Sequence, residues 1–445
     1  MKEPIVSIGI LSEKEIHFDL YGEFINQSDG NKFSGRFKAA IEGDKIRIIN
    51  ENKGDVFPSG TTFLPDDIEA ESFLLKDVVI GRNFHWEKKE NQRFRGSLKF
   101  IKENDVITAI NIIPLEEYLT SVISSEMSLN SSPELLKAHA IVSRGWLLAQ
   151  FEKKRQNKKN KNENNSFNEE EIIHWYDQED HLNYDFCADD HCQRYQGVTK
   201  IVNENALNAI NNTRGLALEF ENIICDTRYS KCCGGITESF ENVWEPVIHP
   251  YLSSVTDYKF ELDDYETDLT VEKSAVQWIK SSPKVFCNTS DQRLLSQILV
   301  DFDRTTNDFF RWQVDYTQNE IAELVRSKSG FDCGNILDLI PIERGHSGRI
   351  IKLKIIGNKK SFVVGKELEI RKMLSTTHLY SSAFYITKEK IINNIPQSFI
   401  IHGAGWGHGV GLCQIGAAVM SELGYSFDEI LTHYFKNAAI QKIYK

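Results

Sequence analysis

The sequence predicts an α+β protein with a mixed, β-rich core, a few helices and a β-rich N-terminal region. Short segments typical of strands, such as "EIHFDLYGEF" and "KIRIIN", fill the first hundred residues between Gly, Asn, Asp and Pro clusters. Apolar residues recur with helical spacing at about 115–129 and 133–151. With 445 residues, 41% of them hydrophobic, the chain can bury a large core, and its length suggests two or three domains.

Four parts are expected along the chain. They are a β-rich N-terminal region (1–95), the first part of the core (96–255), an acidic helical insertion (256–309) and the second part of the core with a glycine-rich signature (310–445). The helix at 133–151 is expected to begin with Pro133, after Ser131 or Ser132 as its cap. The polar stretch 152–171 has a basic half followed by an acidic half, which predicts a solvated loop rather than a nucleic-acid surface.

Charge and hydropathy narrow the class of partners. The net charge is −12, so general electrostatic attraction to nucleic acid or to anionic lipid is not expected. No apolar run approaches the roughly 18 residues of a membrane helix, and the first residues lack the pattern of a secretion signal. We therefore expect no transmembrane segment and no nucleic-acid partner, and these features leave the compartment open.

One carboxylate lies on the apolar face of the first expected helix. That face consists of Leu115, Tyr118, Leu119, Val122 and Ile123. Glu126 falls between two of these positions, whereas Glu117 points to the opposite side. Such an acid either lies at a fraying helix end, pairs with an arginine or backbone amides, or stays protonated and serves as a general acid. Arg144 on the next helix is a candidate partner.

A second candidate site lies in "HLNYDFCADDHC". Thiolate and imidazole are the ligands that zinc prefers, and a tetrahedral site needs four ligands, or three and an open position. We predict a zinc site formed by His181, Cys187 and Cys192, with His191 as the fourth ligand. The alternatives are a disulfide between the two cysteines and histidines that are ordinary surface residues. The remaining cysteines are interpreted as small buried apolar residues.

The glycine-rich stretch "IIHGAGWGHGVGLCQIGA" lacks the spacing of a P-loop and that of a dinucleotide fingerprint. If it is an extended strand, His402, Trp406 and His408 share one face and the alternating glycines leave the other face bare. A bare face suits close packing against another backbone, and it equally suits a polymer lying along the strand. Trp406 beside His408 would suit a sugar, which an aromatic ring can stack on.

Four ordered motifs resemble the SpoIID/LytB family of bacterial cell-wall proteins, also called the stage II sporulation protein D family. They are "PLEEYLTSVISSEM" with "PELLKAHAIVSR"; "TRYSKCCGGITESFENVWEP"; "GHSGRIIKLKIIG" with "IRKML"; and "GAGWGHGVGLCQIGAAVMSELGYSFDEILTHYF". The resemblance covers about 96–256 and 310–445. It departs from the usual family pattern at His139, at Cys413 and at "KCCGG".

The resemblance implies a peptidoglycan lytic transglycosylase that cleaves peptide-poor glycan strands between N-acetylmuramic acid and N-acetylglucosamine. Glu126 falls in the "SEM" motif and would be the single catalytic acid and base. Zinc at 181–192 would be structural or site-organising. The residues implied to bind glycan are Arg144, Tyr229, Ser230, Gly234, Gly235, Thr237, Glu238, Trp406, His408 and Gln414.

Other family members are described as enhancers of cell-wall amidases, so a non-catalytic glycan-binding activator is the alternative. The implied partners are peptidoglycan strands and a cell-wall amidase, and the implied location is the cell envelope. A zinc hydrolase is disfavoured, because the chain has no H-E-x-x-H helix.

Overall fold

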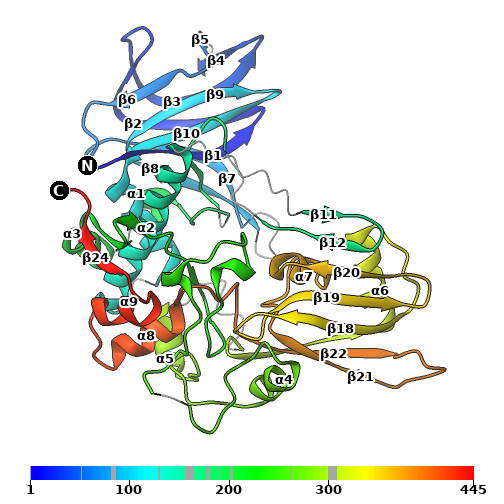
Figure 1. The fold of residues 1–445 in the computed structure, drawn as a ribbon. Helices are drawn as coiled ribbons and strands as arrows, with labels where there is room; N and C mark the ends of the chain where they lie inside the picture. The colour runs from blue at the N-terminus through cyan, green and yellow to red at the C-terminus, as the bar shows by residue number, and fades with distance from the viewer. Residues whose placement is uncertain are drawn as a thin grey trace. The chain divides into compact units, whose positions relative to one another are not determined.

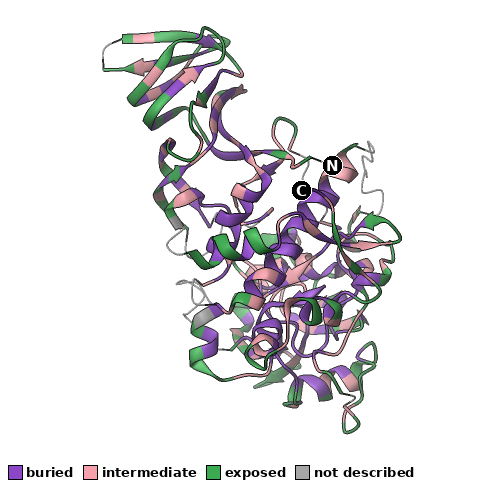
Figure 2. Ribbon diagram, turned by 90° about the vertical axis from the view of Figure 1, so that its left-hand side faces the viewer, coloured by how far each residue is buried: buried purple, intermediate pink, exposed green. Residues whose placement is uncertain are grey.

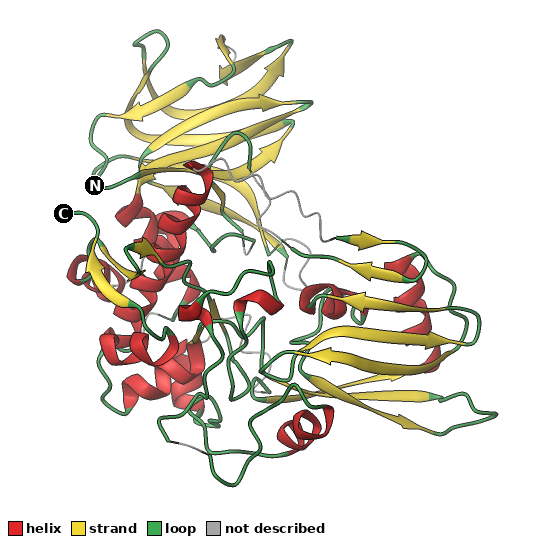
Figure 3. Cartoon of the chain, viewed as in Figure 1, coloured by secondary structure: helices red, strands yellow, loops and turns green. Residues whose placement is uncertain are grey.

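The computed structural model describes most of the chain, whose course is shown in Figure 1. The described residues are 2–51, 53–81, 87–128, 131–155, 165–176, 181–189, 191–200, 204–260, 262–298 and 308–445. Strands and helices are both abundant (Figure 3), which confirms the predicted α+β class. The chain forms two compact units. Unit 1 is Met1–Leu129, Gln178–Leu216 and Lys442–Lys445, and unit 2 is Asn130–Asp177 and Ala217–Gln441.

Unit 1 is built on one large sheet with the strand order β13-β1-β10-β9-β6-β2-β3-β4-β5, in which β7 pairs with β2 and β8. Its strands are β1 (Ile5–Glu13), β2 (Glu15–Asn26), β3 (Lys32–Glu42), β4 (Lys45–Asn50), β5 (Lys53–Pro58), β6 (Thr62–Pro65), β7 (Ser72–Ile80), β8 (Lys88–Phe94), β9 (Ser97–Glu103), β10 (Val106–Pro114) and β13 (Phe186–Cys187). Strands β9 and β10 lie beyond residue 95, yet they belong to the same sheet as β1 to β8.

Phenylalanines fill the core beneath this sheet. The rings of Phe18 and Phe100 lie 5.0 Å apart, and those of Phe18 and Phe37 lie 5.5 Å apart. The outer strands bury little (Figure 2), and the one buried residue of β5 is Phe57. The helices of the unit are α1 (Leu115–Glu126), the 3-10 turn η1 (Gly197–Lys200) and α3 (Glu204–Asn212). Both η1 and α3 contact α1, which directly follows β10.

Unit 2 contains several smaller sheets. One has the order β11-β12-β20-β19-β18, a second β17-β22-β21, and a third β15-β14-β24, whereas β16 and β23 form a parallel pair. The strands are β11 (Ser166–Phe167), β12 (Glu171–Ile173), β14 (Leu216–Phe220), β15 (Ile223–Ile224), β16 (Tyr229–Ser230), β17 (Arg311–Thr317), β18 (Ile336–Arg344), β19 (Ile350–Gly357), β20 (Ser361–Gly365), β21 (Phe384–Glu389), β22 (Ser398–Ala404), β23 (Leu412–Cys413) and β24 (Ala439–Lys442).

The helices of unit 2 have recognisable start and stop signals. They are α2 (Pro133–Arg155), α4 (Glu272–Lys280), α5 (Gln292–Ile298), α6 (Gln318–Ser329), α7 (Glu367–Met373), α8 (Gln414–Glu422) and α9 (Phe427–Tyr434), with 3-10 turns η2 (Phe240–Asn242) and η3 (Pro250–Leu252). Helix α6 begins with a capping box between Thr317 and Glu320 and ends at Gly330, whose φ is +76°. Its Ile321 and Val325 join the apolar core formed with β18, β19, β20 and α7.

The two helices expected after the first strands are present. The first ends at Glu126 rather than near residue 129. The second begins at Pro133, as predicted, and the hydroxyl of Ser132 accepts a hydrogen bond from the amide of Leu135 at 3.3 Å. The second helix continues to Arg155, so the first residues of the expected polar loop are helical, and β11 and β12 lie at its other end. Residues 156–164 of that loop lie outside the described part of the chain.

Candidate functional site

Glu126 is the last residue of α1. The five apolar residues of its helix face are fully buried in unit 1. The Glu126 side chain is half-buried, and its Oε1 accepts a hydrogen bond from the backbone amide of Arg194 at 3.0 Å. Of the alternatives open from the sequence, the structure thus shows a carboxylate at the helix end that pairs with a backbone amide. Glu117 points away, as expected, and forms an ion pair with Arg95 at 3.5 Å.

The segment that reaches Glu126 packs closely on α1. Tyr195, next to Arg194, is fully buried and stacks on Tyr118 of α1 with ring centroids 4.8 Å apart. Its hydroxyl donates a hydrogen bond to Asn111 Oδ1 at 2.6 Å. This packing fixes where the Arg194 amide points, and therefore where the Glu126 carboxylate lies.

The four predicted zinc ligands lie together in unit 1. One ligand atom from each of His181, Cys187, His191 and Cys192 falls within 4.8 Å of all the others. Cys192 Sγ is 3.5 Å from His181 Nε2 and 3.5 Å from His191 Nδ1, and Cys187 Sγ is 3.8 Å from His191 Nδ1. A tetrahedral zinc ion with ordinary Zn–S and Zn–N bonds places sulfur and nitrogen ligands about 3.5 Å apart. The distances therefore fit a zinc ion.

Backbone pairing and electrostatics both favour ligand binding at this cluster. Strand β13 carries Cys187 and pairs in parallel with β1. Hydrogen bonding by Cys192 and by the two histidines lowers the pKa of the Cys187 thiol well below its usual value, despite partial burial. A thiolate, rather than a thiol, is the form that binds a metal. His181 also stacks on Tyr184, with ring centroids 4.6 Å apart.

The glycine-rich signature differs from the expected strand. Strand β22 ends at Ala404, so the prediction of one extended strand that carries His402, Trp406 and His408 is wrong. Gly405, Gly407, Gly409 and Gly411 take φ values of +75°, +90°, +78° and +74°. These values belong to the left-handed region, which side chains disfavour. The alternation of glycine therefore marks a tightly turning chain instead of an extended strand with one bare face.

The glycines also pack against the rest of unit 2. A methyl group at 411 would overlap the carbonyl of Arg228, and one at 405 would approach the backbone of Cys232 and Cys233. A methyl group at 409 would overlap the Arg349 guanidinium. Close packing is thus the reason for these glycines, and a polymer lying on their face is not compatible with this arrangement.

Arg349 is a buried residue that sequence reasoning missed. Its Nε and Nη2 donate to the Gly407 carbonyl at 3.2 and 3.0 Å, and its Nη1 donates to the Cys233 carbonyl at 3.1 Å. The guanidinium therefore links the glycine-rich turn to the neighbouring "KCCGG" segment. The one signal for Arg349 in the sequence is its position in "GHSGR", which belongs to a motif that resembles the SpoIID/LytB family.

The signature presents two partly exposed rings, Trp406 and His408. The backbone amide and carbonyl of Trp406 both form hydrogen bonds with the backbone of Cys232. The centroid of the Trp406 ring lies 4.2 Å from that of the Tyr380 ring. The Val410 amide donates to His408 Nδ1 at 3.0 Å, so the imidazole proton is on Nε2 when the ring is neutral. Burial, followed by the charge of nearby arginines including Arg228, lowers the pKa of His408 well below its usual value.

Next to His408 lie a tryptophan and a cation. The rings of His408 and Trp244 are 4.7 Å apart, and the Arg228 guanidinium lies 4.4 Å from the Trp244 ring centroid. Arg228 also pairs with the buried Asp226 at 2.8 Å, and Lys153 pairs with the same carboxylate at 3.0 Å. Burial alone would raise the pKa of Asp226, but these two cations hold it well below its usual range.

Glu238, expected to bind glycan, is instead engaged in the protein. It is 1% exposed, and its Oε1 accepts hydrogen bonds from the Ser239 and His346 amides and from Asn242 Nδ2. Its Oε2 accepts from the amide and the hydroxyl of Ser347 at 3.2 and 2.5 Å. The carboxylate therefore secures the 345–347 turn. The adjacent Thr237 is also buried and exchanges hydrogen bonds with Val255.

The other expected glycan-binding residues differ in exposure. Tyr229 is partly exposed, and its ring lies 4.5 Å from that of the buried His139. His139 Nε2 is 3.0 Å from the amide nitrogen of Gln414. The residues that are themselves buried, and therefore shape the site from below, are Arg144, Ser230, Gly234, Gly235 and Gln414.

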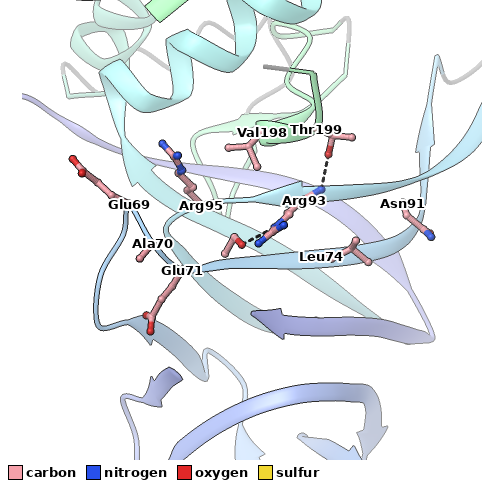
Figure 4. A pocket seen from close by; sticks show the side chains of 10 residues that line it. Glu69, Ala70, Glu71, Leu74, Asn91, Arg93, Arg95, Val198 and Thr199 are labelled. Atoms are coloured by element: carbon pink, nitrogen blue, oxygen red, sulfur yellow. Dashed lines mark hydrogen bonds between the residues drawn. The ribbon is translucent and has the colours of Figure 1, made fainter. Parts of the chain in front are cut away.

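A separate pocket in unit 1 contains none of the predicted site residues among those that line it (Figure 4). Arg93 lies within it and donates from Nε to Ser72 Oγ at 2.7 Å, and the Arg93 amide donates to Thr199 Oγ1 at 2.8 Å. These polar groups are thus already paired with each other.

Comparison with known proteins supports the resemblance. A family model described as "Stage II sporulation protein" matches residues 103–220, and a model described as "Domain of unknown function (DUF8618)" matches residues 238–411. An uncharacterized protein of Brachyspira hyodysenteriae is 25% identical over 415 residues, which cover 92% of this chain and 85% of the relative. Stage II sporulation protein D of Bacillus amyloliquefaciens is 25% identical over 334 residues, 75% of this chain and 76% of the relative.

An amidase enhancer of Bacillus subtilis is also similar, at 25% identity over 261 residues, 54% of this chain and 33% of the relative. These matches support the assignment of the chain to the SpoIID/LytB family. Among the described residues, no helix combines the length and the apolar character needed to cross a membrane.

Proposed function

We propose that this protein acts on peptidoglycan at the cell envelope as a lytic transglycosylase with Glu126 as its acid and base. The observation that carries the proposal is the half-buried Glu126 carboxylate, held at the end of α1 by the Arg194 amide. Relatives named for sporulation and amidase enhancement support the substrate class.

A single carboxylate is sufficient for this reaction. Protonated Glu126 would give its proton to the glycosidic oxygen as the bond to the anomeric carbon breaks. The carboxylate would then take the proton of the sugar 6-hydroxyl as that oxygen attacks the anomeric carbon, which closes the anhydro ring. Because the nucleophile belongs to the substrate, the second carboxylate of ordinary glycosidases is not required. The Arg194 hydrogen bond engages Oε1 and leaves Oε2 for proton transfer.

The His/Cys cluster would bind zinc and organise this carboxylate. Its four ligands fit a tetrahedral ion. Cys192 is two residues before Arg194, whose amide binds Glu126. Zinc would supply a rigid anchor for the 181–195 segment, and the stacking of Tyr195 on Tyr118 transmits that rigidity to α1. We therefore assign the metal an organising role rather than a catalytic one.

In unit 2, the partly exposed rings of Trp244, Trp406 and Tyr229 would contact sugar faces. Arg228 would donate hydrogen bonds to sugar or carboxylate oxygens, whereas His408 is already hydrogen-bonded to the backbone of Tyr229 and Val410. The glycine-rich turn would contribute by placing Trp406 and His408 rather than by touching the glycan.

The test compares the protein with Glu126→Gln and with the matched control Glu117→Gln, which lies on the same helix. Each is incubated with peptide-free glycan strands, and mass spectrometry detects anhydro-muramic ends. We expect product from the unaltered protein and the control, and a loss of at least 100-fold in Glu126→Gln, as for removal of a general acid. Equal product from Glu126→Gln, or none from any of the three, would refute the proposal.

The alternative is a glycan-binding activator of a cell-wall amidase. The similarity to a protein named amidase enhancer favours it. This alternative predicts that the chain sediments with purified cell wall and stimulates an amidase, that both properties survive Glu126→Gln, and that no glycan bond is cleaved. Loss of wall binding in Glu126→Gln would argue against it.

A further inference from the structure

A second group of metal-ligand side chains lies in unit 2, away from the His/Cys cluster in sequence. It consists of Cys233, Asp257, Cys287 and Cys413, and one ligand atom from each falls within 4.8 Å of all the others. The four side chains come from four separate segments: the turn after β16, the loop after η3, the loop after α4, and the end of β23. Each residue is at most 2% exposed.

The spacing of the group suits a single ion. Cys233 Sγ and Cys287 Sγ are 3.6 Å apart. Two thiolates bound to one tetrahedral zinc ion, each at an ordinary Zn–S distance, lie about 3.8 Å from each other. The sulfur atoms are therefore already at nearly the separation that a shared ion requires, and a carboxylate oxygen completes the set.

Hydrogen bonds around the group resemble those that support bound metals. The Cys233 amide donates to Cys413 Sγ at 3.2 Å, and the Gly235 amide donates to Cys233 Sγ at 3.4 Å. Asp257 Oδ2 accepts from the Cys287 amide at 2.7 Å, and Oδ1 accepts from the Tyr434 hydroxyl at 2.5 Å. Such contacts stabilise thiolates and orient a carboxylate toward a metal.

The surrounding charge is also suitable. Three thiolates and a carboxylate would hold four negative charges in a buried place, and a divalent cation would neutralise two of them. The Arg311 guanidinium is buried nearby and donates to the Gly234 and Trp278 carbonyls at 3.1 and 3.0 Å.

We propose that Cys233, Asp257, Cys287 and Cys413 bind a second, structural divalent cation of the zinc type. The ion would tie the "KCCGG" segment, the acidic insertion and the start of α8 to one point. Because the Cys233 carbonyl is bound by Arg349, the ion would also support the glycine-rich turn. The proposal is independent of the catalytic role of Glu126.

The test measures metal content in the full-length chain, purified under reducing conditions. The double variant Cys187→Ser/Cys192→Ser removes the first site and leaves the second site untouched. We expect about two zinc ions per unaltered chain and about one in this variant. Replacing that ion with Co²⁺ should give the near-ultraviolet absorption of thiolate-bound cobalt.

Ligand assignment follows from single substitutions made in the Cys187→Ser/Cys192→Ser background. Cys287→Ser or Asp257→Asn should release the remaining ion, whereas Cys225→Ser, at another buried cysteine, should retain it. Cys232→Ser is the control nearest the site, because the Cys232 thiol lies against Cys287 and Cys413 but outside the proposed ligand set. This variant should also retain the ion.

Two results would overturn the proposal. One is a folded Cys187→Ser/Cys192→Ser chain that contains no metal. This measurement leaves the second site unaltered, so it does not depend on whether variants of the second site fold. The other is a disulfide between Cys233 and Cys287, found by peptide mapping of the purified chain without reduction. Either result leaves the glycan-cleavage test with Glu126→Gln unaffected.

Discussion

Glu238→Gln separates a structural role from a glycan-binding role for a residue in a family motif. The substitution keeps the shape of the side chain and changes one carboxylate oxygen into an NH₂ group. In the structure, Glu238 Oε1 faces three donors, from Ser239, Asn242 and His346, and Oε2 faces the Ser347 amide and hydroxyl. Either orientation of the amide therefore places its nitrogen against at least one backbone donor.

The less costly orientation puts the nitrogen beside Ser347. The Ser347 hydroxyl can rotate and accept from the new NH₂ group, but the Ser347 amide at 3.2 Å loses its acceptor. The remaining hydrogen bonds to Glu238 also lose the benefit of a charged acceptor. Loss of a buried, charge-assisted hydrogen bond costs about 1.5–3 kcal/mol. For a unit of this size, the loss corresponds to a decrease in Tm of roughly 3–5 °C.

Differential scanning calorimetry and sedimentation with purified cell wall together test this reasoning. We expect Glu238→Gln to melt at lower temperature and to bind the wall normally below its Tm. Glu241→Gln is the matched control, because Glu241 is three positions away and partly exposed. An unchanged Tm combined with lost wall binding would refute the structural assignment and restore Glu238 as a glycan ligand.

Three further predictions concern the same part of unit 2. Gly409→Ala should destabilise the protein by about 2–4 kcal/mol, because its φ is +78° and the methyl group would overlap Arg349; urea unfolding that matches the unaltered protein would contradict this. Arg228→Met should cost about 3 kcal/mol in the same assay, since the buried Asp226 loses one of its cations, and an unchanged midpoint would count against that pairing. The pKa of His408 is lowered in the folded state, so the unfolded chain binds the proton at higher pH than the folded chain. The free energy of unfolding should therefore fall as the pH drops below about 6.5, by about 1.4 kcal/mol per pH unit. His408→Gln should remove that share of the slope between pH 7 and 5, and equal slopes in the two proteins would disprove it.

Sequence patterns identified the features whose causes are local. Helical spacing placed Glu126 on the apolar face of α1, and the structure shows that face buried. The zinc-ligand prediction brought together residues from a span of only twelve positions, 181–192, where one turn of the chain is enough to gather them. The amide of Arg194 could not be foreseen, because it reaches Glu126 from 68 residues away.

Long-range packing explains what the sequence could not provide. The second cysteine group joins Cys233, Asp257, Cys287 and Cys413, whose segments are separated by helices and strands. No spacing rule applies to such a set, so the sequence predicts only small buried apolar residues at its cysteines. Arg349 likewise acts on Gly407 across 58 positions.

The glycine-rich signature shows how a regular pattern can indicate the wrong structure. Glycine at every second position suggests the two-residue period of a strand, but a positive φ at every second residue produces the same spacing in a turning chain. The two alternatives differ in what they imply for function. A strand with a bare face would touch the glycan through its backbone. The observed turn instead packs Gly405, Gly409 and Gly411 against the protein and leaves Trp406 and His408 partly exposed. Substitution of a signature glycine should therefore weaken glycan binding only as far as it unfolds the turn, whereas Trp406→Ala should weaken binding in a protein that remains folded.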